Sequence, residues 1–169
     1  MRNLVEPFAG SAGVSIAAAV YRKVTFFHLN DINQLLMMLW HEIIHRPAEI
    51  ADAYERLWME QQADARRSHD HVREEFNRTK RPEYLLYLLA RCVKASVRYN
   101  SEGEFNQSPD NRRLGRHPAR MREDIFAVSR LFRNKSVLTC KDYKEILEQV
   151  TPERPGIYGP AVSGCLYFW

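Results

Sequence analysis

The sequence predicts an α/β fold in which a parallel sheet is interrupted by a helical insertion. Three observations support this prediction. The apolar run Leu4–Phe8 stops at a loop of small residues and is followed by an alanine-rich helical stretch. A second apolar run, residues 24–29, comes next and is followed by Asp31. A helical block of about 85 residues then separates this opening unit from one more strand and helix.

Residue types and their periodicity define the opening unit. Residues 4–8 and 24–29 are expected to be short strands, because they are apolar and the second run is β-branched and aromatic. Residues 14–21 are expected to form the helix between them, and Asn33 is a suitable N-cap for the next helix. The apolar residues of that next helix recur at helical spacing: Leu35, Leu36, Leu39, Trp40, Ile43 and Ile44.

The rest of the chain follows from breakers and amphipathic patterns. Pro47 marks the end of one helix or the start of another, and residues 48–77 begin with an apolar face and then become very polar. The remaining expected elements are a helix over 82–97, a loop or hairpin over 98–118, an amphipathic helix over 119–132, a strand over 137–140 and a helix over 144–149.

Length and composition restrict the class of protein. The 169 residues suffice for one domain, or one domain with a small insertion, and the hydrophobic content of 45% suffices for a core. No apolar run is long enough to span a membrane, and the amino terminus has no signal-peptide pattern. Three widely spaced cysteines, Cys92, Cys140 and Cys165, predict reduced thiols in a cytoplasm.

Positive charge is concentrated in the middle of the chain. Residues 66–134 contain 16 basic and 9 acidic side chains, whereas residues 1–65 contain 5 basic and 8 acidic ones. Such an excess suits a surface that contacts phosphates, although a solvated helical face gives the same pattern.

Two segments of the opening unit predict a nucleotide-binding site. Gly10, without a side chain, allows close approach of the backbone to a ligand. Asp31, 21 residues further on, follows the next strand, where a carboxylate can accept hydrogen bonds from ribose hydroxyls. The spacing of the glycines does not match the dinucleotide motif, so an ordinary strand–turn–helix is the alternative.

Three motifs in order carry a family resemblance. They are Glu-Pro-Phe-Ala-Gly-Ser at 6–11, Leu-Asn-Asp-Ile-Asn at 29–33 and Arg-Tyr-Asn-Ser-Glu-Gly-Glu-Phe-Asn at 98–106. Over residues 4–153 the chain resembles the Dam-like DNA adenine methyltransferases. The resemblance implies an incomplete Rossmann-like S-adenosylmethionine methyltransferase sheet with an inserted helical DNA-recognition region. It also implies a cytoplasmic, monomeric enzyme of a prokaryote or phage, as in restriction-modification, that acts on double-stranded DNA.

The resemblance implies two sets of binding residues. Those expected to bind S-adenosylmethionine are Pro7, Phe8, Ala9, Gly10, Ser11, Asp31, Ile32, Asp142 and Tyr143. Those expected to contact DNA are Arg98, Tyr99, Asn100, Gly103, Phe105, Asn106, Arg112, Arg113 and Arg116, to which Arg120 and Arg122 add further positive charge. Asp142 is equally suited to cap the helix that follows it. Ala12 stands where many relatives have the second glycine of the loop.

A rival motif lies on the helix after Asn33. His41-Glu42-Ile43-Ile44-His45 matches H-E-x-x-H, in which two histidines on one helix face can bind zinc. A convincing third ligand is missing, since His69 and His71 lie in a polar stretch. A zinc hydrolase is therefore the remote alternative, and a non-catalytic DNA-binding fragment is the nearer one.

The family's catalytic motif, Asp-Pro-Pro-Tyr, does not occur in the 169 residues, so no catalytic residue is assigned. One permitted codon string for Glu153–Gly164 reads Glu-Asp-Leu-Val-Tyr-Met-Asp-Pro-Pro-Tyr-Gln once a single C after the Glu153 codon is removed. The hypothesis is that residues 154–169 are an out-of-frame tail. Residues 1–44 and 131–153 would then be a partial methyltransferase core, and 45–130 the target-recognition insertion. The chain is expected to be truncated and inactive in methyl transfer.

Overall fold

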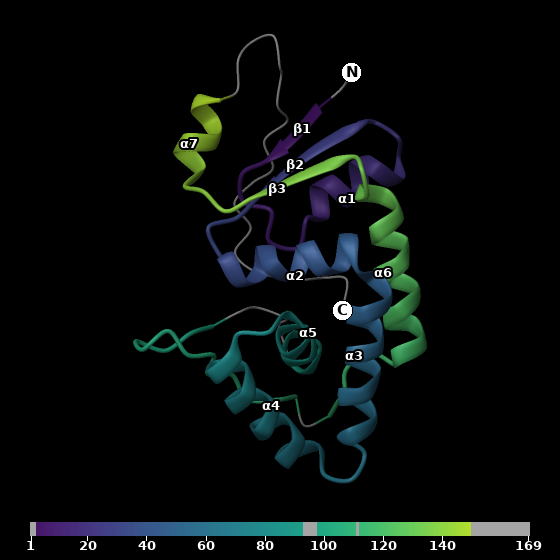
Figure 1. Ribbon diagram of the computed structural model, residues 1–169, viewed down its shortest axis with the longest axis vertical. Helices are drawn as coiled ribbons and strands as arrows, with labels where there is room; N and C mark the ends of the chain where they lie inside the picture. The colour runs from purple at the N-terminus through teal and green to yellow at the C-terminus, as the bar shows by residue number, and fades with distance from the viewer. Residues whose placement is uncertain (1–2, 93–97, 111, 150–169) are drawn as a thin grey trace.

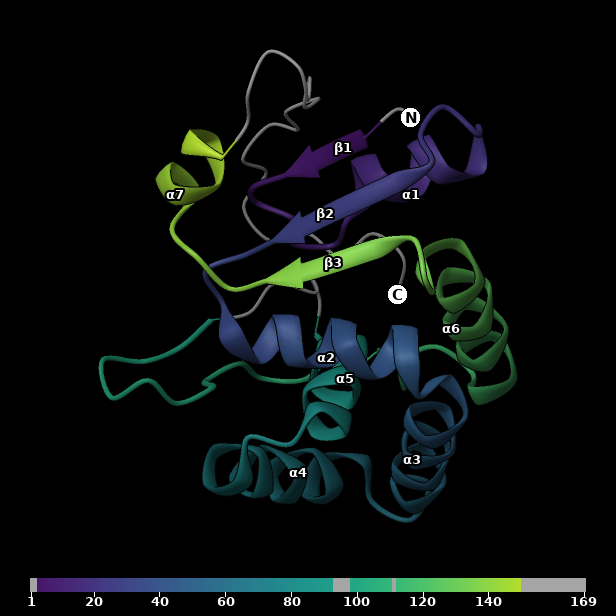
Figure 2. The same ribbon diagram turned by 45° about the horizontal axis from the view of Figure 1, so that its top comes forward.

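A three-stranded parallel sheet forms one end of the computed structural model, which describes residues 3–92, 98–110 and 112–149. Strands β1 (Asn3–Glu6), β2 (Phe26–Asn30) and β3 (Ser136–Thr139) lie in the order β1-β2-β3, and their carboxyl ends point the same way (Figure 2). The strands predicted near these positions are confirmed, with bounds that differ by one or two residues.

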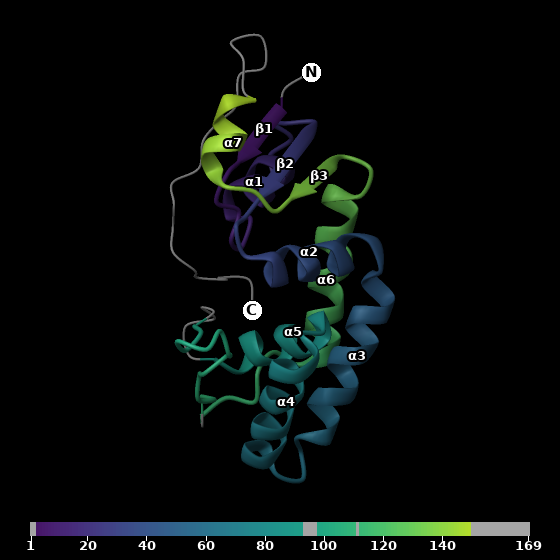
Figure 3. The same ribbon diagram turned by 60° about the vertical axis from the view of Figure 1, so that its left-hand side comes forward.

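Helices flank the sheet and build the other end of the molecule (Figures 1 and 3). Helix α2 lies between the sheet and a helical layer that contains α3, α4 and α5. The helices are α1 (Gly13–Val20), α2 (Gln34–His45), α3 (Pro47–Glu60), α4 (Ala65–Thr79), α5 (Pro82–Arg91), α6 (Pro118–Phe132) and α7 (Tyr143–Glu148).

Capping residues explain where several helices begin. Asn33 caps α2 as predicted, because its side-chain oxygen accepts a hydrogen bond from the Leu36 amide at 3.2 Å. Pro47 is the first residue of α3, a position where its missing N–H costs nothing. Residues 48–77 span two helices, α3 and α4, and Asp64 caps α4 through the amides of Arg66 and Arg67. Helix α5 is shorter than predicted and ends at Arg91.

One continuous hydrophobic core joins the sheet to the helical layer. Phe132 of α6 makes edge-to-face ring contacts with Phe27 of β2 and Trp40 of α2, at centroid distances of 5.1 and 6.2 Å. In α5 the five residues 85–89 are all fully buried, since α2, α3 and α4 pack around it. The mixed α/β class is thereby confirmed. Helix α6 crosses the boundary predicted at residue 130, and the completion of the sheet to a Rossmann-like fold stays a prediction.

The structure contains no helix that could cross a membrane within the residues it describes.

Glu6, at the end of β1, holds the start of α1. Ala12 precedes α1 in the left-handed conformation, with φ of 52°, and provides no side-chain cap. The buried Glu6 carboxylate takes that role, because it accepts hydrogen bonds from the Ser15 amide at 3.1 Å and the Ser15 hydroxyl at 2.5 Å. Burial raises the pKa of Glu6, and the hydrogen bonds from Ser15 lower it by less.

Glu6 is expected to make stability depend on pH. Its pKa is higher in the folded state than the ordinary 4.5, so folding favours the protonated form. Stability contributed by this group is present below pH 4.5 and lost as pH rises through the folded-state pKa. The melting temperature of Glu6→Gln should therefore rise relative to that of the wild type between pH 4.5 and 7. A difference that stays constant over this range would contradict the assignment.

Candidate functional site

The loop after β1 and the loop after β2 meet at the carboxyl edge of the sheet. The Gly10 amide donates a hydrogen bond to Asp31 Oδ2 at 2.9 Å, and the other carboxylate oxygen of Asp31 accepts from the Asn33 amide at 2.9 Å. The Trp40 indole N–H donates to the Gly10 carbonyl at 2.9 Å. The structure thus brings together Gly10 and Asp31, the two residues on which the sequence-based prediction of a nucleotide site depends.

Gly10 presents an open stretch of backbone. Its φ is +49°, a conformation that favours glycine, and a Cβ built there would meet no atom within 4 Å. Ala12 also has positive φ, so the second position of the turn is strained where a glycine would not be. Pro7 and Ala9 are buried beneath the loop, and Ser11 is half-buried beside it.

Asn30 fastens the ends of all three strands and was missed by the sequence analysis. Its fully buried amide donates to the carbonyls of Pro7 and Lys141, both at 2.9 Å. Its side-chain oxygen accepts from the Thr139 hydroxyl at 2.7 Å and the Lys141 amide at 3.0 Å. The side chain therefore fixes the spacing of the loops that follow β1 and β3. The sign of this role in the sequence was the position of Asn30 next to Asp31, at the end of an apolar run.

Apolar side chains flank this edge. The rings of Phe8 and Tyr143 lie 5.0 Å apart, centroid to centroid, and both are partly exposed. Ile32 is 70% exposed, which is high for an isoleucine directly after a buried strand. Such a combination of exposed apolar side chains and a carboxylate suits a ligand with an aromatic base and a hydroxylated sugar.

Asp142 is a helix cap in the structure. Its Oδ1 accepts a hydrogen bond from the Lys144 amide at 2.9 Å at the start of α7. The capping alternative for Asp142 is therefore observed, while a ligand contact through its other oxygen stays a prediction.

The third motif forms the predicted hairpin, which projects from the same side of the molecule as the carboxyl ends of the strands (Figures 1 and 2). Tyr99 pairs with Phe105 in an antiparallel bridge, and Gly103 has a φ of 75° in the turn. Asn100 organises the turn, since its side-chain oxygen accepts from the amides of Glu102 at 3.0 Å and Glu104 at 2.9 Å. Arg98 and Asn106 are exposed at the base of the hairpin.

Two hairpin residues from the predicted DNA-contacting set face the protein interior. Phe105 is 1% exposed and packs edge-to-face against Phe76 of α4, with centroids 6.0 Å apart. Tyr99 packs against the core, and burial raises the pKa of its hydroxyl, whereas the neighbouring Asn33 side chain lowers it. The side chains of Phe105 and Tyr99 therefore anchor the hairpin.

Buried side chains hold the basic loop that follows. Three of its carbonyls accept hydrogen bonds from the helical layer: that of Arg113 from Arg91, that of Leu114 from Gln61 at 2.8 Å, and that of Arg116 from Tyr54 at 2.6 Å. Gly115, with φ of 82°, lies so close to this layer that a Cβ would be 3.1 Å from the Tyr54 hydroxyl and 3.2 Å from the Ala90 carbonyl oxygen. The helical layer thus holds the backbone of residues 113–116 in place.

Ion pairs divide the basic cluster into two groups. Arg116 pairs with Asp124 at 2.5 Å, Arg120 pairs with Glu123 at 2.7 Å, and Arg122 pairs with Asp52 and Glu55. Arg112 and Arg113 share the single carboxylate of Asp110, and their side chains are 81% and 80% exposed. The free positive charge of the loop is therefore concentrated at Arg112 and Arg113.

The H-E-x-x-H motif lies on the carboxyl-terminal half of α2. The ring centroids of His41 and His45 are 4.7 Å apart. Glu42 Oε1 lies 3.4 Å from His41 Nδ1, and Glu42 Oε2 lies 3.7 Å from Arg46 Nη1. In the part of the chain that the structure describes, no group of three or more potential metal-ligating residues occurs. His69 is fully buried in α4, where burial lowers its pKa to about 4.

Comparison with known protein families gives a match. The sequence model of the family described as D12 class N6 adenine-specific DNA methyltransferase matches residues 1–158. A search of curated proteins found no match.

Proposed function

The chain belongs to the D12 class of N6 adenine-specific DNA methyltransferases, and on this basis we propose that it binds S-adenosylmethionine and double-stranded DNA. Family membership implies the methyl donor and the DNA substrate. The observation that carries the proposal for this chain is the junction of Gly10 and Asp31 at the carboxyl edge of a parallel sheet.

The residues at this edge fit the cofactor. Asp31 would accept hydrogen bonds from the ribose hydroxyls, and Ile32 would pack on the adenine. Phe8, Gly10 and Ser11 would lie along the methionine portion, where the open backbone at Gly10 allows close approach. Pro7 and Ala9 would support this loop from below, Tyr143 would complete the apolar wall with Phe8, and the free oxygen of Asp142 would face the adenine amine.

When bound, S-adenosylmethionine supplies an electrophilic methyl group on its sulfonium. Transfer to an adenine amine also requires groups that hold the flipped base and accept from that amine. In related enzymes an Asp-Pro-Pro-Tyr motif is expected to do this, and the 169 residues contain none. We therefore assign binding and no methyl transfer to this chain. The out-of-frame tail hypothesised for residues 154–169 lies outside the described residues, and the encoding DNA sequence tests it directly.

The DNA-contacting surface is proposed to combine the exposed parts of the hairpin and of the basic loop. Arg98, Asn100 and Asn106 would contribute from the hairpin, with Gly103 shaping the turn, and Arg112 and Arg113 from the loop. Residues 45–130 would thus form the recognition region, and residues 1–44 and 131–153 the cofactor-binding core.

Direct binding measurements on the purified chain test this proposal. Calorimetry should detect S-adenosylmethionine binding, duplex DNA should bind with an affinity that falls as salt rises, and no tritiated methyl group should reach the DNA. Failure to bind either ligand would refute the proposed function. Methyl transfer at a measurable rate would refute the assignment of an inactive chain.

Arg112→Ala is expected to reduce the salt dependence of DNA binding. A contact between one arginine and one phosphate contributes about 0.9 to the slope of log K against log salt. The slope should therefore fall by about 1, together with a similar loss of affinity on all sequences. Arg120→Ala is the matched control, because Arg120 is already paired with Glu123, and its slope should stay near that of the wild type. Equal changes of the salt slope in the two variants would contradict the assignment of the free positive charge to Arg112 and Arg113.

A further inference from the structure

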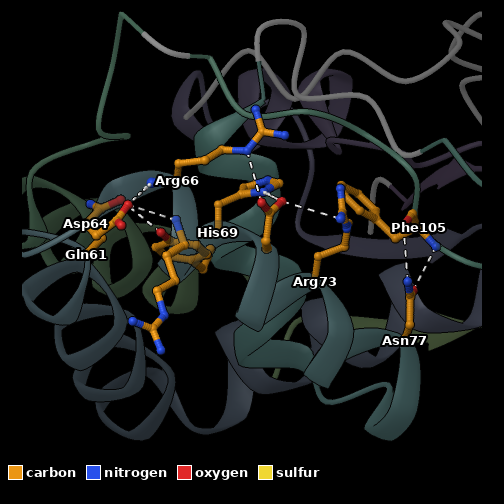
Figure 4. Close-up of polar contacts among 10 residues, drawn as sticks. Gln61, Asp64, Arg66, His69, Arg73, Asn77 and Phe105 are labelled. Atoms are coloured by element: carbon orange, nitrogen blue, oxygen red, sulfur yellow. Dashed lines mark hydrogen bonds and ion pairs between the residues drawn. The ribbon is translucent and has the colours of Figure 1, made fainter.

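The side chain of Asn77 in α4 makes two hydrogen bonds to the backbone of one hairpin residue, Phe105 (Figure 4). Its side-chain oxygen accepts from the Phe105 amide at 2.8 Å, and its side-chain nitrogen donates to the Phe105 carbonyl at 3.2 Å. These are the two bonds that a neighbouring β-strand would make, so a single amide side chain serves in place of a strand.

The contact fixes where the hairpin lies relative to α4. The Phe105 side chain enters the core against Phe76, one residue before Asn77, so an apolar and a polar contact hold the same hairpin residue. The hairpin's own hydrogen bonds, such as those between Asn100 and Glu104, set its internal shape without attaching it to the helical layer.

Asn77 also lines a groove of about 450 Å³ between α4 and the hairpin. Arg73 and Arg78 line one side of this groove, and Asn100 and Asn106 line the other. Asn100 and Asn106 belong to the surface proposed to contact DNA. The orientation of that surface thus depends on the bonds at Phe105.

We propose that Asn77 is a positioning residue for DNA binding, which holds the hairpin in its DNA-contacting orientation before DNA arrives. The inference rests on the proposed function and extends it to a residue that was not among the predicted contacts. Because Asn77 holds the hairpin before DNA binds, binding does not include the entropic cost of ordering it.

The first test is the DNA affinity of Asn77→Ala. The dissociation constant for duplex DNA should rise by about tenfold, since the hairpin must then be ordered on binding. Binding of S-adenosylmethionine should stay unchanged, and exchange of the Phe105 amide with solvent should accelerate. The matched control is Ser129→Ala, which removes a buried hydrogen bond between the Ser129 hydroxyl of α6 and the Ile44 carbonyl, away from the hairpin.

A pH profile separates positioning from a general loss of stability. Asn77→Asp keeps an acceptor for the Phe105 amide but places a carboxylate against the Phe105 carbonyl, so DNA binding should weaken at pH 7.5. Protonation restores the donor, and the ratio of its dissociation constant to that of the wild type should fall as pH is lowered to about 4, close to the ordinary pKa of an aspartate. The charged groups that line the same groove are Arg73, Glu74 and Arg78 of α4 and Glu104 of the hairpin. The wild type and Asn77→Asp both contain these groups.

The outcomes are distinguishable. A tenfold loss in Asn77→Ala, with Ser129→Ala near the wild type and recovery of Asn77→Asp at pH about 4, supports the inference. Wild-type affinity in Asn77→Ala, or an equal loss in both alanine variants, overturns it. If the wild-type chain binds no DNA, the proposed function fails and the inference fails with it.

Discussion

Asp31→Ala is expected to lower the affinity for S-adenosylmethionine by at least about a hundredfold. A hydrogen bond to a charged group contributes about 1.5–3 kcal/mol, and two ribose hydroxyls would lose such bonds together. The substitution also releases the Gly10 amide, which Asp31 holds at 2.9 Å, so the loop that lines the cofactor loses its support. Isothermal titration calorimetry measures the effect directly.

Asp64→Ala is the matched control for this substitution. The Asp64 carboxylate likewise accepts two backbone hydrogen bonds, from the amides of Arg66 and Arg67, but at the start of α4 rather than at the sheet edge. Its removal should cost about 1 kcal/mol of stability and leave cofactor affinity unchanged. Wild-type affinity in Asp31→Ala would show that the Gly10–Asp31 junction is only a structural turn.

Asn30→Ala is expected to destabilise the fold by about 3–5 kcal/mol, because it removes four hydrogen bonds made by one fully buried side chain. Their partners are the carbonyls of Pro7 and Lys141, the Lys141 amide and the Thr139 hydroxyl. Urea unfolding measures the change in free energy. Since Asn30 joins the ends of all three strands, cofactor binding should be lost together with stability.

Ser136→Ala provides the comparison for Asn30. The Ser136 hydroxyl makes one bond, to the Phe132 carbonyl at 3.0 Å, so its loss should cost about 1 kcal/mol. If Asn30→Ala lowers the free energy of unfolding by no more than Ser136→Ala does, the buried Asn30 amide does not determine the geometry of the site.

Local patterns predicted the parts of the fold that depend on neighbours in sequence. The N-cap at Asn33, the helix start at Pro47 and the hairpin around Gly103 each follow from a few adjacent residues, and each is observed. The approach of Gly10 to Asp31 could also be predicted, because the carboxyl ends of adjacent parallel strands lie at one edge.

Long-range partners explain what the sequence could not reveal. Asn30 is satisfied by Pro7 and Lys141, which are 23 and 111 residues away. Arg122 meets Asp52 and Glu55 about seventy positions earlier, so a count of charges along the chain overstates the free positive charge. Phe105 was assigned to the DNA surface because it belongs to the motif, whereas the hairpin pairing turns its ring toward Phe76.

The way the basic loop is attached leaves its outward side chains free to vary. Tyr54, Gln61 and Arg91 bind main-chain carbonyls, which every amino acid possesses. Residues at 112, 113 and 114 could therefore be exchanged over evolution, or in a designed library, without moving the backbone that presents them. Gly115 is the exception, because its conformation and close packing admit no side chain. Such a scaffold separates the support of the loop from the chemistry of the side chains that it presents.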